Sequence, residues 1–313
     1  MLNKNSKIGV TSRTFCRSRA MRQELEKSFY EIKYNDKGSH FDEDSLIEFL
    51  NECDGAIISG EPLTKKVLRS LPNLKVISKF GVGVDNIDFD SVEDENKEFF
   101  FQPGVNANSV AELTLGYLII LLREAYVLNR GLISGNWGKV TSLSRELSES
   151  TVGIIGYGQI GKRLQKYLTS HQCEVIIYDP YLNKNTNEEL SNKLVSTLDE
   201  LLGQSDAVTL HLPLTNATEN IINHKELKMM KRNSVLLNLS RGGLVSEDAL
   251  YESLISGHLA GAALDVHIDE PRVNNKLIQL PNVFLSPHIA GTSNKSSNDL
   301  GTSAIQGLLN YIK

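Results

Sequence analysis

Short apolar runs alternate with amphipathic stretches along the chain, and this alternation predicts its secondary structure. In the first third, apolar runs lie at residues 8–10, 29–34, 56–58, 76–79 and 99–101, with helical patterns between several of them. Strands that alternate with helices in this way are typical of parallel sheets. The pattern therefore predicts a βαβ domain in this part of the chain.

The second half repeats the pattern with stronger apolar runs. They lie at residues 152–155, 175–178, 207–211, 235–239, 261–266 and 283–285. Such runs suit strands that are buried on both faces of a parallel sheet. We therefore predict the α/β class, with two Rossmann-like or flavodoxin-like βαβ domains.

A long apolar helix is predicted between the two domains, at residues 109–130. Ser109 and Glu112 have the spacing of a capping box, in which each side chain satisfies the backbone N–H of the other. The only tryptophan, Trp137, follows in a loop. An interface position and ordinary packing within the domain are equally compatible with it.

The domain boundaries follow from the two ends of the chain. The 313 residues exceed what one hydrophobic core usually spans. Residues 292–313 have helical periodicity, and we expect them to return to the first domain. The prediction is a discontinuous first domain at 1–103 plus 288–313, a second domain at 104–287, and a cleft between them.

Composition narrows the kinds of partner. The net charge of −5 gives no footprint for nucleic acid or a membrane surface. The longest apolar run, residues 113–122, is about half of what spans a bilayer, and the N-terminus carries no signal-like segment. The three cysteines lack metal-ligand or disulfide spacing. We expect a cytoplasmic protein, without metal, whose partner is a small molecule.

A glycine-rich turn carries the strongest signal for a cofactor. Residues 151–161 read TVGIIGYGQIG, so Gly156, Gly158 and Gly161 form G-x-G-x-x-G between an apolar strand and a helix. Such a turn cradles a pyrophosphate at the helix N-terminus. Asp179 ends the next strand, where a carboxylate can bind a ribose 2′-hydroxyl and repel a 2′-phosphate. NAD is therefore predicted, although Lys184 nearby keeps NADP open.

Three polar side chains that follow later strands are candidates for the chemistry. Arg241, Glu270 and His288 are expected beside the dinucleotide, because ligands bind at the carboxyl ends of parallel strands. His288 suits proton transfer at neutral pH, and Glu270 suits orienting the imidazole and favouring its charged form. Arg241 can hold the carboxylate of a 2-keto acid. His211 ends another strand and is interpreted as a neighbour of the cofactor.

These motifs together resemble the D-isomer-specific 2-hydroxyacid dehydrogenases, especially the phosphoglycerate-dehydrogenase-like members, over nearly the whole chain. The resemblance rests on KFGVGVDNID at 79–88, PGVN at 103–106, SVAE at 109–112, the glycine loop, HLPLT at 211–215, SRGG at 240–243, Asp265, Glu270-Pro271 and PHIAG at 287–291. It implies hydride transfer between NAD and a D-2-hydroxy or 2-keto acid, with Glu270 and His288 as the acid-base pair and Arg241 as the carboxylate clamp.

The resemblance also implies that residues 1–103 plus 288–313 form the substrate-binding domain and residues 104–287 the NAD-binding domain. It further implies which residues line each ligand, and a homodimer built on the NAD-binding domain. The residues expected at the substrate are Lys79, Gly81, Val82, Gly83, Asn106 and Arg241. Those expected at NAD are Gly156, Gly158, Gln159, Ile160, Gly161, Asp179, His211, Pro213, Thr218, Leu239, Ser240, Arg241, Asp265, His288, Ala290 and Gly291. For Lys79, binding of a phosphate and simple solvation are equally open.

Two departures and two alternatives stay open. Gln159 stands where relatives often carry Arg, which removes one phosphate contact. From the length we expect no C-terminal regulatory domain like that of longer phosphoglycerate dehydrogenases. A non-catalytic NAD-sensing protein, like co-repressors of similar sequence, would retain the same motifs. A formate- or phosphite-type donor is a third reading, although formate-type sites carry Gln where Glu270 stands here. The particular substrate is not predicted.

Overall fold

The computed structural model describes residues 1–138, 144–182, 190 and 193–312. They form two compact units, Met1–Asn106 with Thr292–Lys313, and Ala107–Gly291. The boundaries expected from the sequence, after residues 103 and 287, lie slightly earlier than these. In the described residues, no helix is long and apolar enough to cross a membrane.

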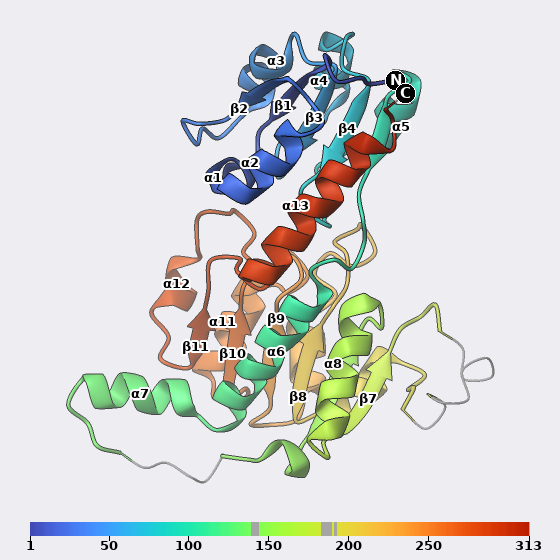
Figure 1. Cartoon of the computed structure of the whole chain (residues 1–313). Helices are drawn as coiled ribbons and strands as arrows, with labels where there is room; N and C mark the ends of the chain where they lie inside the picture. Colours follow the sequence, from blue (N-terminus) through green and yellow to red (C-terminus); the bar gives the residue numbers. More distant parts are fainter. Residues whose placement is uncertain (139–143, 183–189, 191–192, 313) are drawn as a thin grey trace. The chain divides into compact units, whose positions relative to one another are not determined.

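The first unit is a parallel sheet covered by helices on both faces (Figure 1). Its strands are β1 (Lys7–Val10), β2 (Glu31–Tyr34), β3 (Gly55–Ile58), β4 (Val76–Lys79) and β5 (Glu98–Phe100), in the order β2-β1-β3-β4-β5. Its helices are α1 (Arg13–Arg17), α2 (Arg19–Glu26), α3 (Glu43–Leu50), α4 (Lys65–Ser70), α5 (Phe89–Asp94) and α13 (Asn294–Leu309).

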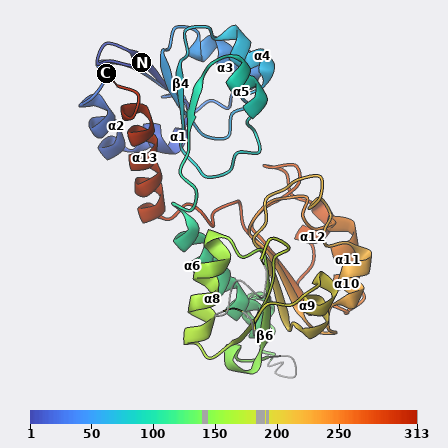
Figure 2. The same cartoon turned by 90° about the vertical axis from the view of Figure 1, so that its right-hand side faces the viewer.

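Alternation along the strands divides the core of this unit into two layers. Ile57 on β3 and Val76 on β4 pack with residues of α2 and α13, whereas Ile58 and Ile77 pack with residues of α3 and α4. Figure 2 shows α2 and α13 on one side of the sheet and α3, α4 and α5 on the other. The buried apolar runs seen in the sequence are therefore strands with two covered faces.

The second unit has the same layered design around a six-stranded parallel sheet, in the order β11-β10-β9-β8-β6-β7. Its strands are β6 (Thr151–Ile155), β7 (Glu174–Tyr178), β8 (Ala207–Leu210), β9 (Val235–Asn238), β10 (Gly261–Leu264) and β11 (Val283–Leu285). Its helices are α6 (Ala107–Leu122), α7 (Ala125–Ile133), the 3-10 helix η1 (Leu147–Glu149), α8 (Gln159–Ser170), α9 (Leu198–Gln204), α10 (His224–Met229), α11 (Glu247–Ile255) and α12 (Asn275–Ile278).

The sheet of the second unit reverses its winding between β6 and β8. The chain passes from β6 outward to β7 and then crosses back to β8 on the other side of β6. Helices α6 and α8 supply one core layer, and α9, α10 and α11 supply the other. Ligands of open α/β sheets bind outside the carboxyl ends of the strands at such a reversal. The predicted fold class, two parallel α/β sheets, is confirmed.

Two details of the predicted linker helix are wrong. The single helix expected at 109–130 is two helices, and Glu124 between them has a left-handed φ of 51°. The carbonyl of Leu122 accepts a hydrogen bond of 2.8 Å from the backbone N–H of Arg145, which takes the acceptor that a continuing helix would use. Ser109 is not an N-cap, because α6 begins at Ala107 and the Ser109 hydroxyl donates to the carbonyl of Ala290 at 2.7 Å.

Candidate active site

The glycine turn of the second unit is shaped by contacts that admit no side chain. Gly156 has a φ of 91°, and a Cβ there would lie 2.5 Å from the carbonyl oxygen of His211. A Cβ on Gly161 would lie 2.4 Å from the carbonyl oxygen of Gly156, whereas a Cβ on Gly158 would meet no atom within 4 Å. The first and third glycines therefore pack the turn between β6, α8 and the end of β8, and the second keeps the approach to the backbone open.

Helix α8 begins at Gln159, directly after this turn. Its N-cap, Gly158, provides no side-chain hydrogen bond. The first N–H groups of a helix point outward with the positive end of the helix dipole, which favours an anion. The turn therefore fits the pyrophosphate of a dinucleotide, and Gln159 and Ile160 lie where the sequence expects them, at the start of the helix.

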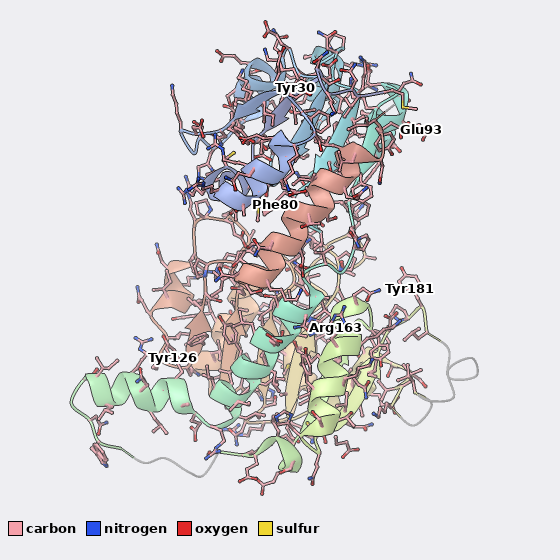
Figure 3. The ribbon with its side chains drawn as sticks, in the orientation of Figure 1. Tyr30, Phe80, Glu93, Tyr126, Arg163 and Tyr181 are labelled. Carbon is pink, nitrogen blue, oxygen red and sulfur yellow. The ribbon has the colours of Figure 1, made fainter. Side chains whose placement is uncertain are left out.

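Asp179 joins the end of β7 to the glycine turn. Its carboxylate oxygens accept hydrogen bonds from the backbone N–H of Tyr157 at 2.9 Å and of Tyr181 at 3.0 Å. Tyr181 itself points into solvent and is 94% exposed (Figure 3). The carboxylate is thus fixed beside the phosphate cradle, which is the place for a ribose contact. Lys184, the cation that kept NADP open, lies outside the described residues.

The strands next to the glycine turn end in hydrogen-bonded loops. Burial lowers the pKa of His211 to about 3, so its imidazole is neutral at physiological pH. The hydroxyl of Thr218 donates to the carbonyl of Pro213 at 2.7 Å, and that of Ser240 donates to Leu210 at 2.7 Å. Leu239, which precedes Ser240 in the chain, is buried. These predicted cofactor neighbours therefore lie at the carboxyl edge of the sheet, in closed loops.

His288 and Glu270 form a direct pair. His288 Nδ1 lies 2.8 Å from Glu270 Oε2. The other carboxylate oxygen of Glu270 accepts the backbone N–H of His267 at 3.0 Å, which fixes the direction of the carboxylate. The hydrogen bond to Glu270 raises the pKa of His288, while burial and the positive charge of Arg241 oppose this rise. Imidazole, carboxylate and guanidinium therefore act on one another within this unit.

The pKa of Glu270 moves in the opposite direction. Burial raises the pKa of this carboxyl, but the hydrogen bonds from His288 and from the His267 backbone outweigh burial, and the net shift is downward. A lowered pKa on the carboxyl and a raised pKa on the imidazole both favour the ion pair. Both shifts therefore stabilise the protonated imidazole beside the ionised carboxylate.

Asp265 holds the loop that carries His288. Its buried carboxylate accepts the Ser286 hydroxyl at 2.5 Å and the backbone N–H groups of Ile289 and Ala290 at 2.8 and 2.7 Å. Its carbonyl accepts the N–H of His288 at 2.8 Å. His288 has a left-handed φ of 53°, a conformation that a bulky residue keeps only when its surroundings enforce it. The Asp265 contacts supply that enforcement.

The Arg241 loop lies against the loop before Glu270. A Cβ added to Gly242 would lie 2.1 Å from the carbonyl oxygen of His267. The guanidinium of Arg241 donates to the carbonyl of Ser240 at 2.7 Å, and the Arg241 carbonyl accepts the side-chain amide of Asn238 at 2.8 Å. This close approach brings the guanidinium to the side of the acid-base pair.

In the first unit, Lys79 is buried and its side chain is hydrogen-bonded to neighbouring loops. It is 4% exposed, and its ammonium donates to the carbonyl of Ser59 and, at 2.8 Å, to the side-chain oxygen of Asn86. Gly81 follows with a φ of 149°, and Val82 and Gly83 are half-buried in the same loop. Asn106 is the last residue of this unit before the chain enters α6.

Comparisons with known proteins decide the family. Residues 115–290 match the model of the D-isomer specific 2-hydroxyacid dehydrogenase NAD binding domain. The D-3-phosphoglycerate dehydrogenase of Methanocaldococcus jannaschii is 36% identical over 83% of this chain and 50% of that protein. The hydroxypyruvate reductase of Thermotoga maritima is 33% identical over 85% of this chain and 87% of that protein.

The chain belongs to the D-isomer specific 2-hydroxyacid dehydrogenase family. Among solved structures, the D-lactate dehydrogenase of Aquifex aeolicus with NAD and lactic acid superposes with a TM-score of 0.82, at 27% identity, over 97% of this chain and 94% of that one. The chain spans about half the length of the M. jannaschii relative. Three expectations are confirmed at the level of the family. They are membership of this family, an NAD-dependent enzyme, and NAD as the cofactor.

One histidine and one serine of this site in the second unit were not predicted from the sequence. The backbone N–H of His267 donates to Glu270, and its Nε2 lies 3.1 Å from the carbonyl oxygen of Ser286. Ser286 in turn donates to Asp265. The three-residue spacing of His267 and Glu270 was the one available signal.

Proposed function

We propose that this chain interconverts a D-2-hydroxy acid and its 2-keto acid with NAD, as a phosphoglycerate-dehydrogenase-like enzyme. The observation that carries the proposal is the His288–Glu270 pair, with 2.8 Å between Nδ1 and Oε2, in the unit that bears the dinucleotide turn. The charge of Arg241 reaches the same imidazole. Carbonyl reduction needs these three kinds of group.

The cofactor would be held by the turn and by the strand ends around it. Gly156, Gly158 and Gly161 form the cradle, and Asp179 would accept the ribose hydroxyls. When bound, NADH supplies the hydride that adds to the keto carbon, and NAD⁺ accepts it in the reverse direction.

His288 would move the proton. During reduction, the Nε2–H of the protonated ring donates to the keto oxygen as negative charge develops there. Glu270 holds Nδ1 and stabilises the charged ring, so the proton leaves from Nε2. In oxidation, neutral His288 would take the hydroxyl proton back at Nε2.

Arg241 would bind the substrate carboxylate. A guanidinium can make two parallel hydrogen bonds to a carboxylate, and this geometry orients the keto carbon. On the first unit, the backbone N–H groups of Val82 and Gly83, together with Asn106, are proposed for the same carboxylate. Gly81 shapes their loop. Lys79 is proposed as a positioning residue for it, because its ammonium already holds Ser59 and Asn86.

We further propose a homodimer formed through the second unit and a small 2-hydroxy or 2-keto acid as the partner molecule. A non-catalytic NAD-sensing role is the alternative. Turnover separates the two proposals, because a sensor would bind NADH but would not oxidise it, whichever 2-keto acid is added.

The test is NADH oxidation with a panel of 2-keto acids, on the wild type and on His288→Asn. Asparagine tolerates the left-handed backbone at this position and cannot donate a proton at neutral pH. We expect the variant to bind NADH normally and to lose roughly 10²–10⁴ in hydride-transfer rate. Arg241→Ala should chiefly raise KM. Near-normal turnover of the His288 variant would remove this residue from the mechanism.

A further inference from the structure

His267 is a buried histidine that takes no part in the proposed chemistry. It follows β10, precedes Glu270 by three residues, and is 7% exposed. Its ring nitrogens differ, because Nε2 lies 3.1 Å from the carbonyl oxygen of Ser286, whereas Nδ1 is buried with no hydrogen-bond partner among the described residues. A buried polar atom without a partner costs free energy. The contact of Nε2 is therefore the feature that favours histidine over an apolar ring at this position.

His267 contacts the loops of all three side chains proposed for the chemistry. Its backbone N–H donates to Glu270 Oε1 at 3.0 Å. Its carbonyl oxygen packs against the loop of the proposed guanidinium clamp, where a Cβ on Gly242 would lie 2.1 Å from it. Its ring reaches the carbonyl of Ser286, two residues before His288. One residue therefore joins the three loops, all of them within the second unit.

The ring contact has one possible direction. A carbonyl oxygen accepts and cannot donate, so the hydrogen lies on Nε2 and His267 is the donor. The backbone N–H of Ser286 is held as well, since it donates to the carbonyl of Leu264 at 3.0 Å. Pro287 follows, and its fixed φ leaves little freedom between the Ser286 carbonyl and His288. The direction of this carbonyl therefore sets where the loop of His288 begins.

The two polar contacts of His267 act on the two members of the acid-base pair. The backbone N–H orients one carboxylate oxygen of Glu270, and the ring holds the backbone ahead of His288. Between these two anchors lies the 2.8 Å contact of His288 Nδ1 with Glu270 Oε2. A hydrogen bond weakens steeply when its angle or its length departs from the optimum. The strength of this contact therefore depends on His267 holding both sides.

The charges around His288 make a loss of positioning measurable. The hydrogen bond to Glu270 is the largest cause that raises the pKa of His288, and the charges of Glu270 and Asp265 add to it. Burial and the charge of Arg241 lower the same pKa. Of these causes, the hydrogen bond depends most on geometry. Loss of the His267 donor should therefore lower the pKa of His288.

We propose that His267 is a positioning residue, whose ring and backbone together hold Glu270 and His288 at the distance that proton transfer needs. The proposal rests on the proposed dehydrogenase function and adds a residue to it. An imidazole suits this role, because it is rigid and carries a donor at its tip. It thereby ties the loop after β10 to the loop after β11, the neighbouring parallel strand. A phenyl ring would fill a similar volume without the donor.

Three substitutions separate the hydrogen bond of the ring from its shape. His267→Phe keeps an aromatic ring without a donor, His267→Gln keeps a donor at a reach similar to Nε2, and His267→Asn carries the same amide on a shorter stem. Kinetics use NADH with hydroxypyruvate or glyoxylate, whichever the wild type reduces faster. For His267→Phe and His267→Asn we expect kcat to fall about 10- to 100-fold and KM to change less than about 3-fold, whereas His267→Gln should stay within about 3-fold of the wild type in both. The alkaline limb of kcat/KM should move to lower pH in the first two variants only.

A second measurement does not need turnover. Nuclear magnetic resonance follows the ring signals of isotope-labelled histidines through pH in the NAD-loaded protein, and the signal of His288 is assigned by its loss in His288→Asn. We expect its titration midpoint to fall in His267→Phe and His267→Asn and to stay unchanged in His267→Gln. Such a fall without turnover of either acid would support the positioning role, and the dehydrogenase function would fail alone. An unchanged midpoint while the wild type turns over would refute the positioning role alone.

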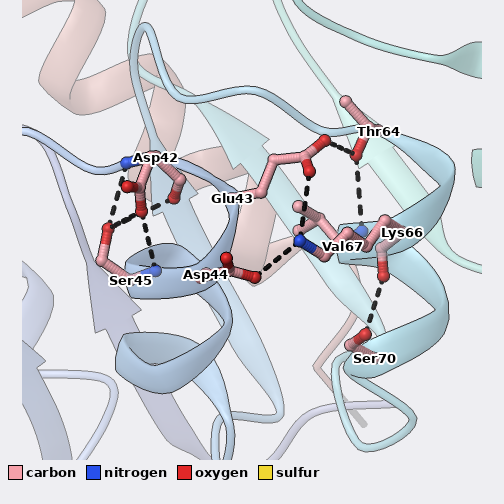
Figure 4. Close-up of polar contacts among 8 residues, drawn as sticks. All are labelled: Asp42, Glu43, Asp44, Ser45, Thr64, Lys66, Val67 and Ser70. Atoms are coloured by element: carbon pink, nitrogen blue, oxygen red, sulfur yellow. Dashed lines mark hydrogen bonds and ion pairs between the residues drawn. The ribbon is translucent and has the colours of Figure 1, made fainter.

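Two control variants lie away from the site. His258 makes the same kind of contact at the other end of β10, with Nε2 3.0 Å from the carbonyl of Met230. Thr64 belongs to a network in the first unit, where its hydroxyl donates to Glu43 at 2.5 Å and accepts the backbone N–H of Val67 (Figure 4). His258→Phe and Thr64→Val should each lower Tm and leave both the alkaline limb and the midpoint of His288 unchanged.

The sign of the shift separates positioning from the charge of the ring. A charge on His267 would repel the proton of His288, so its removal would raise the midpoint, whereas lost positioning lowers it. A rise, an equal fall in the two control variants, or a His267→Gln as impaired as His267→Asn would overturn the proposal. If His267→Phe does not fold, the comparison of His267→Gln with His267→Asn decides.

Discussion

At the scale of single residues, the chemistry depends on charges that shift one another. Glu270 raises the pKa of His288 through a hydrogen bond, and His288 in turn lowers the pKa of the partly buried Glu270 carboxyl. Arg241 opposes the first effect without removing it. His288 and Glu270 therefore titrate as one coupled pair, and the pH dependence of the proposed catalysis belongs to this pair.

Glu270→Gln tests this coupling. Reduction needs protonated His288, so activity falls as pH rises through the pKa of the imidazole. Glutamine lacks the charge that raises this pKa, and the alkaline limb of kcat/KM for keto-acid reduction should move to lower pH. For oxidation, which needs neutral His288, the acid limb should move in the same direction. Profiles measured in both directions check this, and unchanged limbs with a merely lower rate would show that Glu270 does not set the pKa.

The sequence predicts the side chains proposed for the chemistry and misses the side chains that hold them in place. Arg241, Glu270 and His288 were found because each follows a strand end, where parallel sheets bind ligands. Ser286 and His267 were not found, because their roles come from contacts with Asp265 and Glu270 that only the folded chain creates. Asn35 in the first unit is a similar case, since it bridges two loops that are distant from the glycine motif.

At the scale of elements, helix and strand positions follow local patterns, and the errors arise from long-range contacts. The central strands were predicted because a parallel sheet buries them on both faces, as in β3, β4, β8, β9 and β10, whose residues are all buried. The break between α6 and α7 was not, because Leu122 bonds to Arg145, more than 20 residues further along the chain. The capping box predicted at Ser109 is absent for a similar reason, because the Ser109 hydroxyl donates to the carbonyl of Ala290.

The loop that contains Gly242 packs closely against the His267 loop, and a substitution can test this contact. Gly242→Ala would place its Cβ 2.1 Å from the carbonyl oxygen of His267, so one loop must move. We expect a loss of stability of about 1–3 kcal/mol, as for overpacked sites, and a lower kcat because the Glu270 loop shifts. Denaturant unfolding and steady-state kinetics measure the two effects.

Gly203 provides the matched control for this substitution. It is exposed in α9, and a Cβ there would meet no atom within 4 Å. Gly203→Ala should therefore stabilise the protein by roughly 0.5–1 kcal/mol, since alanine costs less entropy in a helix. A Gly242 variant as stable and active as its Gly203 counterpart would contradict the tight contact between the two loops.

At the scale of the whole molecule, α7 is a helix with one face anchored and another exposed. Tyr126, labelled in Figure 3, packs edge-on against Phe284 of β11 at 4.9 Å, and Arg130 donates to the carbonyl of Leu280 at 3.2 Å. Four apolar side chains of the helix and of the following loop are exposed, Val127, Leu132, Ile133 and Trp137, and we refer to them as the α7 patch; Ile133 and Trp137 are 79% and 80% exposed. Aromatic and aliphatic groups gathered in this way mark interfaces.

Trp137 is 80% exposed, so it packs little against the described residues of its own unit. An interface position, as in the proposed homodimer, is the prediction that can be tested. Sedimentation of the wild type should give twice the mass of one chain. Ile133→Glu and Trp137→Glu each bury a charge in the proposed contact, so they should shift the equilibrium to the monomer and leave the far-UV signal unchanged. Ile255→Glu is the control, because Ile255 at the end of α11 is 57% exposed and outside the patch. If that control dissociates the dimer as well, or the patch variants stay dimeric, the interface lies elsewhere, and the α7 surface then needs another partner to explain its apolar side chains.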